Sequence, residues 1–207
     1  MVKKADIPGH IIDTAMKLAA ERGWRDLSLA EIADAAKLPL SKVYPVFPSK
    51  TAILGAFSRQ IDAAVLAAAE LEAGEAGARE GGAHDRLFDT LMRRFDALRP
   101  YREALGNIVC AEAGDPVAAL CSLCRLGRSM ACMLEAARLS ATGLRGALRV
   151  KALGLAYLAT LRVFLRDDSP DMAATMAALD RNLSRLGRLA RLCSRTRYSP
   201  ADVLQKT

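Results

Sequence analysis

The sequence predicts an all-α protein, with a three-helix head at the N-terminus and a larger helical bundle as its body. Ala and Leu abound in the 207 residues, β-branched residues are few, and apolar positions recur at helical spacing over long stretches. A content of 52% hydrophobic and 26% charged residues is typical of a globular chain and excludes a disordered one. We therefore expect helices and no strands.

The head is expected to hold short helices over residues 9–22, 29–36 and 40–46. The first has an apolar stripe and ends at Gly23, because glycine is a common stop signal for helices. Ser28 and Glu31 have the spacing of a capping box, in which each side chain satisfies a backbone N–H of the other residue, and this predicts the start of the second helix. Two short helices joined by a tight turn and supported by a preceding helix form a helix-turn-helix.

Glycines and prolines divide the rest of the chain. Residues 72–84 contain four glycines and almost nothing to bury, so we expect a flexible loop there. The predicted organisation is a helix-turn-helix domain over 1–50, a linking helix over 51–71, the loop over 72–84 and a helical body over 85–207. The helices of the body are expected near residues 85–98, 101–113, 117–139, 143–166 and 172–195.

Residues 10–60 resemble the N-terminal domain of the tetracycline-repressor (TetR) family of transcriptional regulators. The resemblance rests on Leu-Ala-Glu-Ile-Ala-Asp-Ala-Ala over 29–36, on Val43-Tyr44 and on Phe-Pro-Ser-Lys over 47–50. It implies a homodimer that binds double-stranded DNA with its heads. It also implies that the body dimerises and binds a small apolar effector, for which an isoprenoid or another lipid is one option. We expect from it a transcriptional regulator, in the first instance a repressor.

The resemblance assigns the DNA contacts to the second and third helices of the head. In the family, the tyrosine and the lysine of the matching run contact phosphates, which gives these roles to Tyr44 and Lys50, and Ser28 matches another phosphate-contacting position. The exposed face of the third helix supplies the remaining candidates. The residues expected at the DNA interface are Ser28, Pro39, Leu40, Ser41, Lys42, Tyr44 and Lys50.

Some residues of the head depart from the family pattern. Lys37 stands at the usual turn glycine, and Pro39 stands at the usual Ser or Thr that caps the recognition helix. Pro45 lies inside that helix, where a proline removes one N–H and clashes with the carbonyl four residues earlier. We therefore expect a kinked or shortened recognition helix.

The helices of the body have broad apolar faces that predict core packing, and an effector pocket is expected among them. The candidate pocket residues are Met130, Met133, Leu134, Leu155, Tyr157 and Leu158. The last helix combines an apolar stripe with a row of arginines. The residues expected to make it a dimer or membrane helix are Met176, Leu179, Leu183, Leu186, Arg181, Arg185 and Arg188. Two interpretations stay open for it: a dimer or bundle helix with a solvated basic face, or a helix that docks on anionic lipid or an acidic partner.

The second interpretation is linked to a second resemblance. Residues 153–169, followed by Thr175-Met176 and by Leu-Asp-Arg over 179–181, are similar to the C-terminal part of a ubiquinone-biosynthesis accessory family. Those proteins share the TetR-type fold, bind isoprenoid lipids and use a terminal amphipathic helix at the membrane. The alternative function is therefore that of a lipid-binding accessory protein with a degenerate helix-turn-helix.

Catalytic and metal sites are not expected. Cys121 and Cys124 form a single C-x-x-C motif without further ligands at zinc-site spacing, so we expect buried core cysteines. Asp167-Asp168 is interpreted as helix capping. No catalytic motif is present, so we expect no enzyme, no metal and no cofactor. The net charge of +7 is concentrated in residues 138–207. No apolar run approaches the roughly 18 residues of a membrane span, so no membrane-spanning helix is expected. The five cysteines are an odd number, which suits a reduced cytoplasmic protein.

Overall fold

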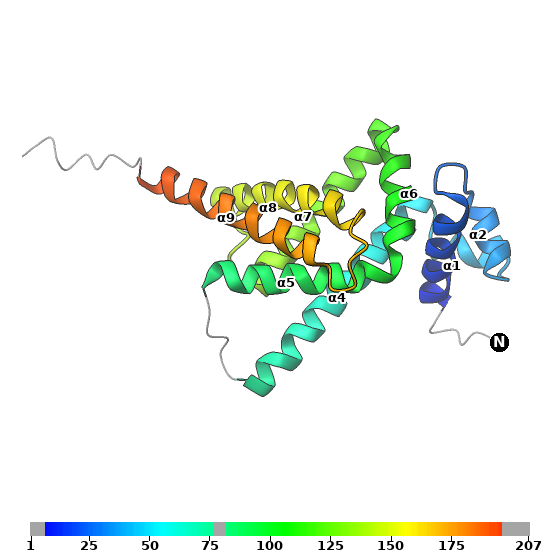
Figure 1. The fold of residues 1–207 in the computed structure, drawn as a ribbon. Coiled ribbons are helices and arrows are strands. Elements are labelled where there is room, and N and C mark those ends of the chain that lie inside the picture. The colour runs from blue at the N-terminus through cyan, green and yellow to red at the C-terminus, as the bar shows by residue number, and fades with distance from the viewer. Residues whose placement is uncertain (1–6, 77–81, 196–207) are drawn as a thin grey trace, which may run out of the picture.

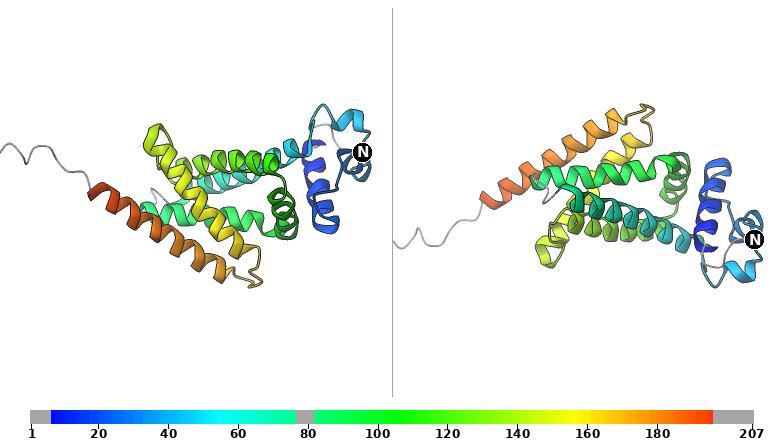
Figure 2. Two further views of the ribbon diagram at one scale, coloured as in Figure 1. Left: turned by 90° about the horizontal axis from the view of Figure 1, so that it is seen from above. Right: turned by 90° about the horizontal axis from the view of Figure 1, so that it is seen from below.

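The structure, a computed structural model, describes residues 7–76 and 82–195, and all regular secondary structure in these ranges is helical. Its elements are α1 (Ile7–Arg22), α2 (Leu29–Ala35), α3 (Leu40–Val43), α4 (Lys50–Ala76), α5 (Ala83–Leu98), the 3₁₀ helix η2 (Arg99–Tyr101), α6 (Arg102–Ala113), α7 (Pro116–Ala136), α8 (Gly143–Phe164) and α9 (Ala173–Arg195). A small head lies at one end and a larger body at the other, with α4 running from one into the other (Figure 1). Both views of Figure 2 show the same separation. The expected all-α class is confirmed.

The head packs around one apolar core. α1 buries Ile11 and Ala15, α2 buries Ile32, α3 buries Val43, and the first turns of α4 bury Ile53. Each of these residues is at most 1% exposed, which is the burial that an amphipathic helix needs to become stable in water. The same cluster of buried side chains continues along α4 into the body. The head is therefore packed on a helix that it shares with the body.

The turn between α2 and α3 keeps the backbone that a glycine favours, although it carries Lys37. The φ angle of Lys37 is 56°, in the left-handed region. Its N–H donates to the Asp34 carbonyl (3.0 Å) and the next N–H, of Leu38, donates to the Ala33 carbonyl (3.0 Å), which is the hydrogen-bond pattern of a Schellman motif. An L-residue in this region carries strain that glycine does not.

Two boundaries differ from the sequence-based prediction. The loop expected over 72–84 is shorter at both ends, because the Ala- and Glu-rich residues 72–76 continue α4, and α5 begins at Ala83, where the Gly82 N–H donates to the Asp85 carboxylate. Its centre, residues 77–81, lies outside the described residues. The recognition helix α3 ends at Val43 and not at Val46, as the proline at position 45 predicts.

A buried network of one ion pair and two hydrogen bonds joins the helices of the body. Arg94 of α5 is 5% exposed and pairs with Asp62 of α4. Its Nε donates to the hydroxyl of Tyr157 on α8 (3.3 Å), and the hydroxyl of Ser129 on α7 donates to Asp62 (2.5 Å). A buried cation is tolerated only when it is paired and hydrogen-bonded, so this network fixes the packing of α4, α5, α7 and α8 against one another.

Two helices are apolar enough to resemble membrane spans. Lys50–Leu71 and Pro116–Ala136 reach a mean hydropathy of 1.3 and 1.4 over their most apolar windows, so the expectation that no stretch approaches a span was wrong. The core helices of water-exposed proteins meet the same criterion, and α4 and α7 pack against each other inside the body. Their composition is therefore weak evidence for a membrane.

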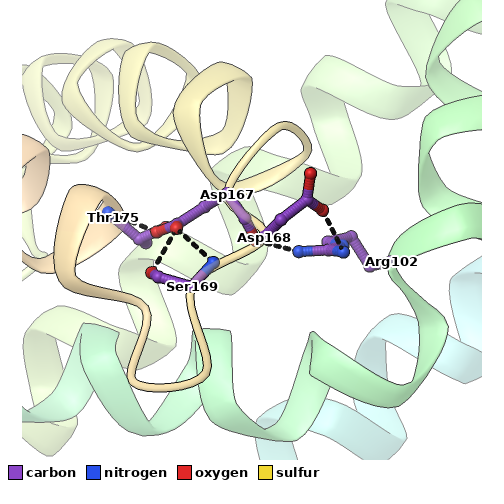
Figure 3. A network of polar contacts seen from close by, with 5 residues as sticks. All are labelled: Arg102, Asp167, Asp168, Ser169 and Thr175. Carbon is purple, nitrogen blue, oxygen red and sulfur yellow. Dashed lines mark hydrogen bonds and ion pairs between the residues drawn. The ribbon is translucent and has the colours of Figure 1, made fainter.

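The turn between α8 and α9 is tied by carboxylates (Figure 3). Asp167 accepts hydrogen bonds from the N–H and hydroxyl of Ser169 and from the N–H (2.7 Å) and hydroxyl (2.6 Å) of Thr175, in the first turn of α9. Burial would raise the pKa of Asp167, but these hydrogen bonds outweigh it and lower the pKa to about 2. Arg102 of α6 donates to the Asp167 carbonyl and to the Asp168 carboxylate (2.7 Å). The capping role predicted for this pair of residues is thus confirmed for Asp167.

The strained turn gives a first prediction. Lys37→Gly should stabilise the protein by roughly 0.5–1 kcal/mol, because relief of left-handed strain exceeds the added flexibility of the unfolded chain. The expected gain in Tm, measured by thermal unfolding, is roughly 1–3 °C. Lys42→Gly, inside α3, is the control and should lower the Tm. A lower Tm for Lys37→Gly would show that its side chain supports the turn.

The cap at the start of α9 gives a second prediction, on the stability of the protein. Asp167→Asn should lower the free energy of unfolding by about 1–2 kcal/mol at neutral pH, because the charge that accepts these hydrogen bonds is lost. Since the folded pKa lies below the ordinary 3.8, the contribution is present above that pH and is lost as the pH falls through about 2. Chemical denaturation across this range should therefore show the two stability curves converging in acid. Asp168→Asn is the control: its side chain is 90% exposed and its ion pair should contribute little.

Candidate nucleic-acid interface

The face of α3 that points away from the head core carries most of the expected DNA contacts. Val43 is fully buried and Phe47 is 5% exposed, and they anchor α3 in the core of the head, where it packs against α2. On the other side Leu40 is 44% and Tyr44 is 59% exposed. Pro39, Ser41 and Lys42 are also exposed. The structure therefore brings the predicted recognition residues together on one accessible surface.

Pro45 shortens α3 without removing the turn that follows. The Tyr44 N–H donates to the Leu40 carbonyl (2.9 Å), but beyond Pro45 both Val46 and Phe47 donate to the carbonyl of Val43 (3.0 and 2.8 Å). Because Pro45 has no N–H to donate, the α-helical pattern is interrupted there, and the Val46 N–H bonds to the carbonyl three residues earlier instead of four. The candidate base-reading side chains are therefore limited to this one short segment, and the expected shortening of the helix is confirmed.

The donors of Ser28 are already engaged. Its N–H (2.8 Å) and hydroxyl (2.7 Å) both donate to the carboxylate of Glu31, and its hydroxyl oxygen accepts from the Glu31 N–H (3.2 Å). These hydrogen bonds to Ser28 lower the pKa of Glu31. The predicted capping box is therefore confirmed. A phosphate at Ser28 would have to displace a carboxylate, which makes this position a weaker phosphate contact than the sequence predicts.

Lys50 is bound within the head. Its ammonium donates to the carbonyls of Trp24 (2.9 Å) and Arg25 (3.0 Å) and lies 5.3 Å from the centre of the Trp24 ring. Burial lowers its pKa, against the nearby charges of Asp26 and Glu31. Lys50, for which the resemblance implies a phosphate contact, thus clamps the start of α4 to the loop after α1.

Further contacts that sequence reasoning missed hold the head in place. The His10 ring, through Nε2, contacts the Ala36 carbonyl of the recognition turn (3.0 Å). Asn107 of α6 donates to the carbonyls of Ala19 (2.9 Å) and Ala20 (3.3 Å) near the end of α1. His10 and Ala36 are 26 positions apart in the sequence, and Asn107 is almost 90 positions from the end of α1. No local sequence pattern predicts contacts between residues so far apart.

The expected effector pocket is not assembled as a group. Met130 and Met133 are fully buried, and Leu134 (2% exposed) and Tyr157 (4% exposed) also belong to the core. Leu155 points out of the body, with 71% of its surface exposed, and Leu158 is half-buried. Leu155 is therefore corrected from a pocket residue to a surface residue, because it lies on the face of α8 opposite Leu153 and Ala156.

The apolar stripe of α9 is used inside the protomer. Leu179 (0% exposed) and Leu183 (4% exposed) pack in the core, where α9 lies along α8, and Leu186 is half-buried. Met176 is 42% exposed, and Arg181, Arg185 and Arg188 face outward. The stripe is thus largely covered by the chain itself, which agrees with the interpretation of a bundle helix with a solvated basic face and corrects Leu179 and Leu183 from dimer or membrane contacts to core residues.

The cysteines are less buried than expected. Cys124 is exposed and Cys121 is half-buried, so the prediction of core cysteines at this C-x-x-C motif was wrong. They lie on the side of α7 that faces away from the buried Met130 and Met133. Among the described residues no group of His, Cys, Asp and Glu side chains is arranged to hold a metal ion.

Comparisons with known proteins place this geometry in context. The family model described as "Bacterial regulatory proteins, tetR family" matches residues 11–57, which span α1 to the first turns of α4. A TetR transcriptional regulator from Nitrosomonas europaea is 25% identical over 88% of this chain and 98% of its own, with a TM-score of 0.71. One from Rhodococcus sp. RHA1 shares the fold, with 17% identity, coverage of 89% and 97%, and a TM-score of 0.62. No curated protein gave a significant match.

Proposed function

We propose that this chain acts as a TetR-family transcriptional regulator, and specifically as a homodimeric repressor that leaves its DNA when a small apolar effector binds. The observation that carries the DNA-binding part is the exposed surface formed by Leu40, Ser41 and Lys42 of α3 and by Tyr44 directly after it, above the buried Val43. Regulators of this family act by binding and are generally not enzymes. We place its action in the cytoplasm, where its DNA would be.

Recognition would divide between base edges and phosphates. Ser41 and Lys42 are the polar side chains of α3 that can read bases in the major groove, and Lys42 is its only long donor. Tyr44, Lys50 and the N-terminal end of α2 at Ser28 would contact phosphates, which fix the register of the head without reading sequence. Few base contacts per head imply modest specificity for a single head.

An unpartnered apolar stripe on α8 supports the homodimer. Leu144, Leu148 and Leu155 are 90%, 68% and 71% exposed and follow helical spacing along one face. A two-fold contact would bury this stripe against the same stripe of a second copy. The dimer would then present two heads at half-sites one helical turn apart, about 34 Å.

An effector would act by changing the separation of the two heads. Ligand binding shifts an equilibrium only if it favours one arrangement, so the effector must contact parts that move relative to each other. The lipid-binding accessory function is not favoured. The apolar side of α9 that would enter a membrane is covered by α8, and the two compared structures are described as transcriptional regulators.

The head gives a prediction on DNA binding. Tyr44→Phe should weaken binding on all sequences alike and leave the Tm unchanged, because the exposed hydroxyl serves only the phosphate. Lys50→Ala should lower the slope of log affinity against log salt by about one unit and also lower the Tm, because two carbonyls lose their donor. Fluorescence anisotropy on genomic fragments and random DNA, titrated with salt, measures both. If neither variant changes binding, the head is not the interface.

The dimer gives another. Leu148→Glu combined with Leu155→Glu should yield folded monomers with much weaker operator binding, because two buried charges cannot be accommodated in a two-fold apolar contact. Sedimentation velocity reports the oligomeric state and circular dichroism the fold. Leu71→Glu is the matched control, since Leu71 is a similarly exposed (73%) leucine on α4. A dimer that survives the double substitution would contradict this interface.

A further inference from the structure

A groove lies where the head meets the body. It has a volume of about 470 Å³, which is in the range of small-molecule sites. Val46 and Phe47, just after α3, form its head side, and Leu120 and Cys124 of α7 form its body side. Gly55 of α4 also lines it. The lining is thus apolar at both sides and joins parts of the protein that are far apart in the chain.

Arginines surround the groove. Arg59 of α4 and Arg128 of α7 are exposed, line it, and have no ion-pair partner among the described residues. Arg125 lines it as well, and its Nη2 donates to the Glu112 carboxylate (2.6 Å) and to Ser122. The Glu112 charge balances one of these three cations only. The groove therefore has an excess of positive charge beside its apolar sides.

One of the arginines has an unused buried donor. Nη1 of Arg125 is buried and has no hydrogen-bond partner in the described part of the chain. The Arg125 side chain is only 12% exposed, and its ion pair with Glu112 holds it in place. A buried N–H without an acceptor carries a desolvation penalty, which an anionic oxygen would remove if it reached this donor.

We propose that this groove binds a single-chain amphiphile whose apolar chain ends in an anionic oxygen group. The chain would lie against Val46, Leu120 and Cys124, and the carboxylate or phosphate would lie among Arg59, Arg125 and Arg128. Guanidinium groups present paired donors that match such oxygens, which makes anions the preferred head group. A neutral apolar molecule would leave the arginines unused, and a cation would be repelled.

The position of the groove gives the ligand a regulatory role, which rests on the proposed function. Val46 and Phe47 continue directly from α3, whereas Leu120 and Cys124 belong to the body. A ligand wedged between them favours one placement of the head relative to α7. The effector of the proposed repressor is therefore an apolar acid.

Calorimetric titration without DNA tests the site by itself. Decanoate and decyl phosphate should bind, and decanol and decyltrimethylammonium, which share the chain but lack the negative charge, should bind at least about tenfold more weakly. The two anions together distinguish carboxylate from phosphate. Equal affinity for the neutral or the cationic compound would overturn the proposal, as would binding of none.

Variants locate the ligand. Arg59→Gln combined with Arg128→Gln should lower decanoate affinity about tenfold or more, and Arg145→Gln, an exposed arginine at the far end of α8, should leave it unchanged. Gly55→Leu should fill the groove between the arginines and abolish binding. Gly55→Ala is its matched control, because a Cβ there would lie 3.5 Å from Arg59 Nη1 and 3.9 Å from Arg125 Cδ, at ordinary contact distance. Circular dichroism verifies that each variant folds.

Thiol protection gives an independent location. Decanoate should slow alkylation of Cys124, which lines the groove, and leave Cys110, an exposed cysteine of α6 outside it, unaffected. Equal alkylation of Cys124 with and without decanoate would overturn the site.

The failure of this site can be told apart from failure of the proposed function. DNA affinity of the ligand-free protein tests the function, and the DNA-free titration tests the groove. If the Arg59 and Arg128 double variant loses DNA affinity without any ligand, these arginines belong to the DNA interface and the ligand proposal is wrong. Decanoate should weaken DNA binding of the wild type and have no effect on that of Gly55→Leu.

Discussion

The buried ion pair between Arg94 and Asp62 is the constraint on which the arrangement of the body depends. A guanidinium that is 5% exposed must keep its partners, which are Asp62 of α4 and Tyr157 of α8, and Ser129 of α7 donates to the same Asp62. The pair thus fixes the rotation of α4 about its axis at the point where α4 enters the body. The first turns of the same helix carry Ile53 in the head core, so the orientation of the head follows from a contact made two turns further along.

A second connection limits how the head moves. Asn107 of α6 donates to carbonyls near the end of α1, and Arg102, at the start of α6, holds the turn between α8 and α9. The head is therefore attached to the body through two helices, α4 and α6, and α6 is in turn tied to the helix that bears the exposed leucine stripe. A change at the head–body groove would act against both attachments, which favours two discrete head positions over a continuous range.

The fold and the exposed face of α3 that is proposed to bind DNA could be predicted from the sequence because their signals are local. The capping box of Ser28 and Glu31, the apolar spacing of α1 and the effect of Pro45 each lie within one helix or turn. Two other contacts could not be predicted from the sequence, because they join residues that are distant in the chain. These are the contact of Lys50 with Trp24 and the hydrogen bonds of Asn107 to α1. For α9, amphipathic spacing identifies a buried face but not the partner that buries it, and α8 of the same chain is as good a partner as a twin. Leu155, which was predicted to line a pocket and is exposed, was misassigned for the same reason. In a helix with apolar residues on several sides, the sequence does not indicate which side is buried.

The state of the head also explains why a dimer would be needed. The donors of Ser28 are taken by Glu31, the ammonium of Lys50 is shared with two carbonyls, and α3 is cut short before Pro45, which leaves Lys42 and Tyr44 as the least encumbered contacts. A single head of this kind would bind DNA weakly, whereas two linked heads would gain affinity because binding of the first would raise the effective concentration of the second. That gain depends on the distance between the heads and disappears when geometry prevents both from binding at once. Under the proposed function, weak heads would make the protein more sensitive to head separation, so a small displacement at the groove between Phe47 and Leu120 would be enough to release the DNA.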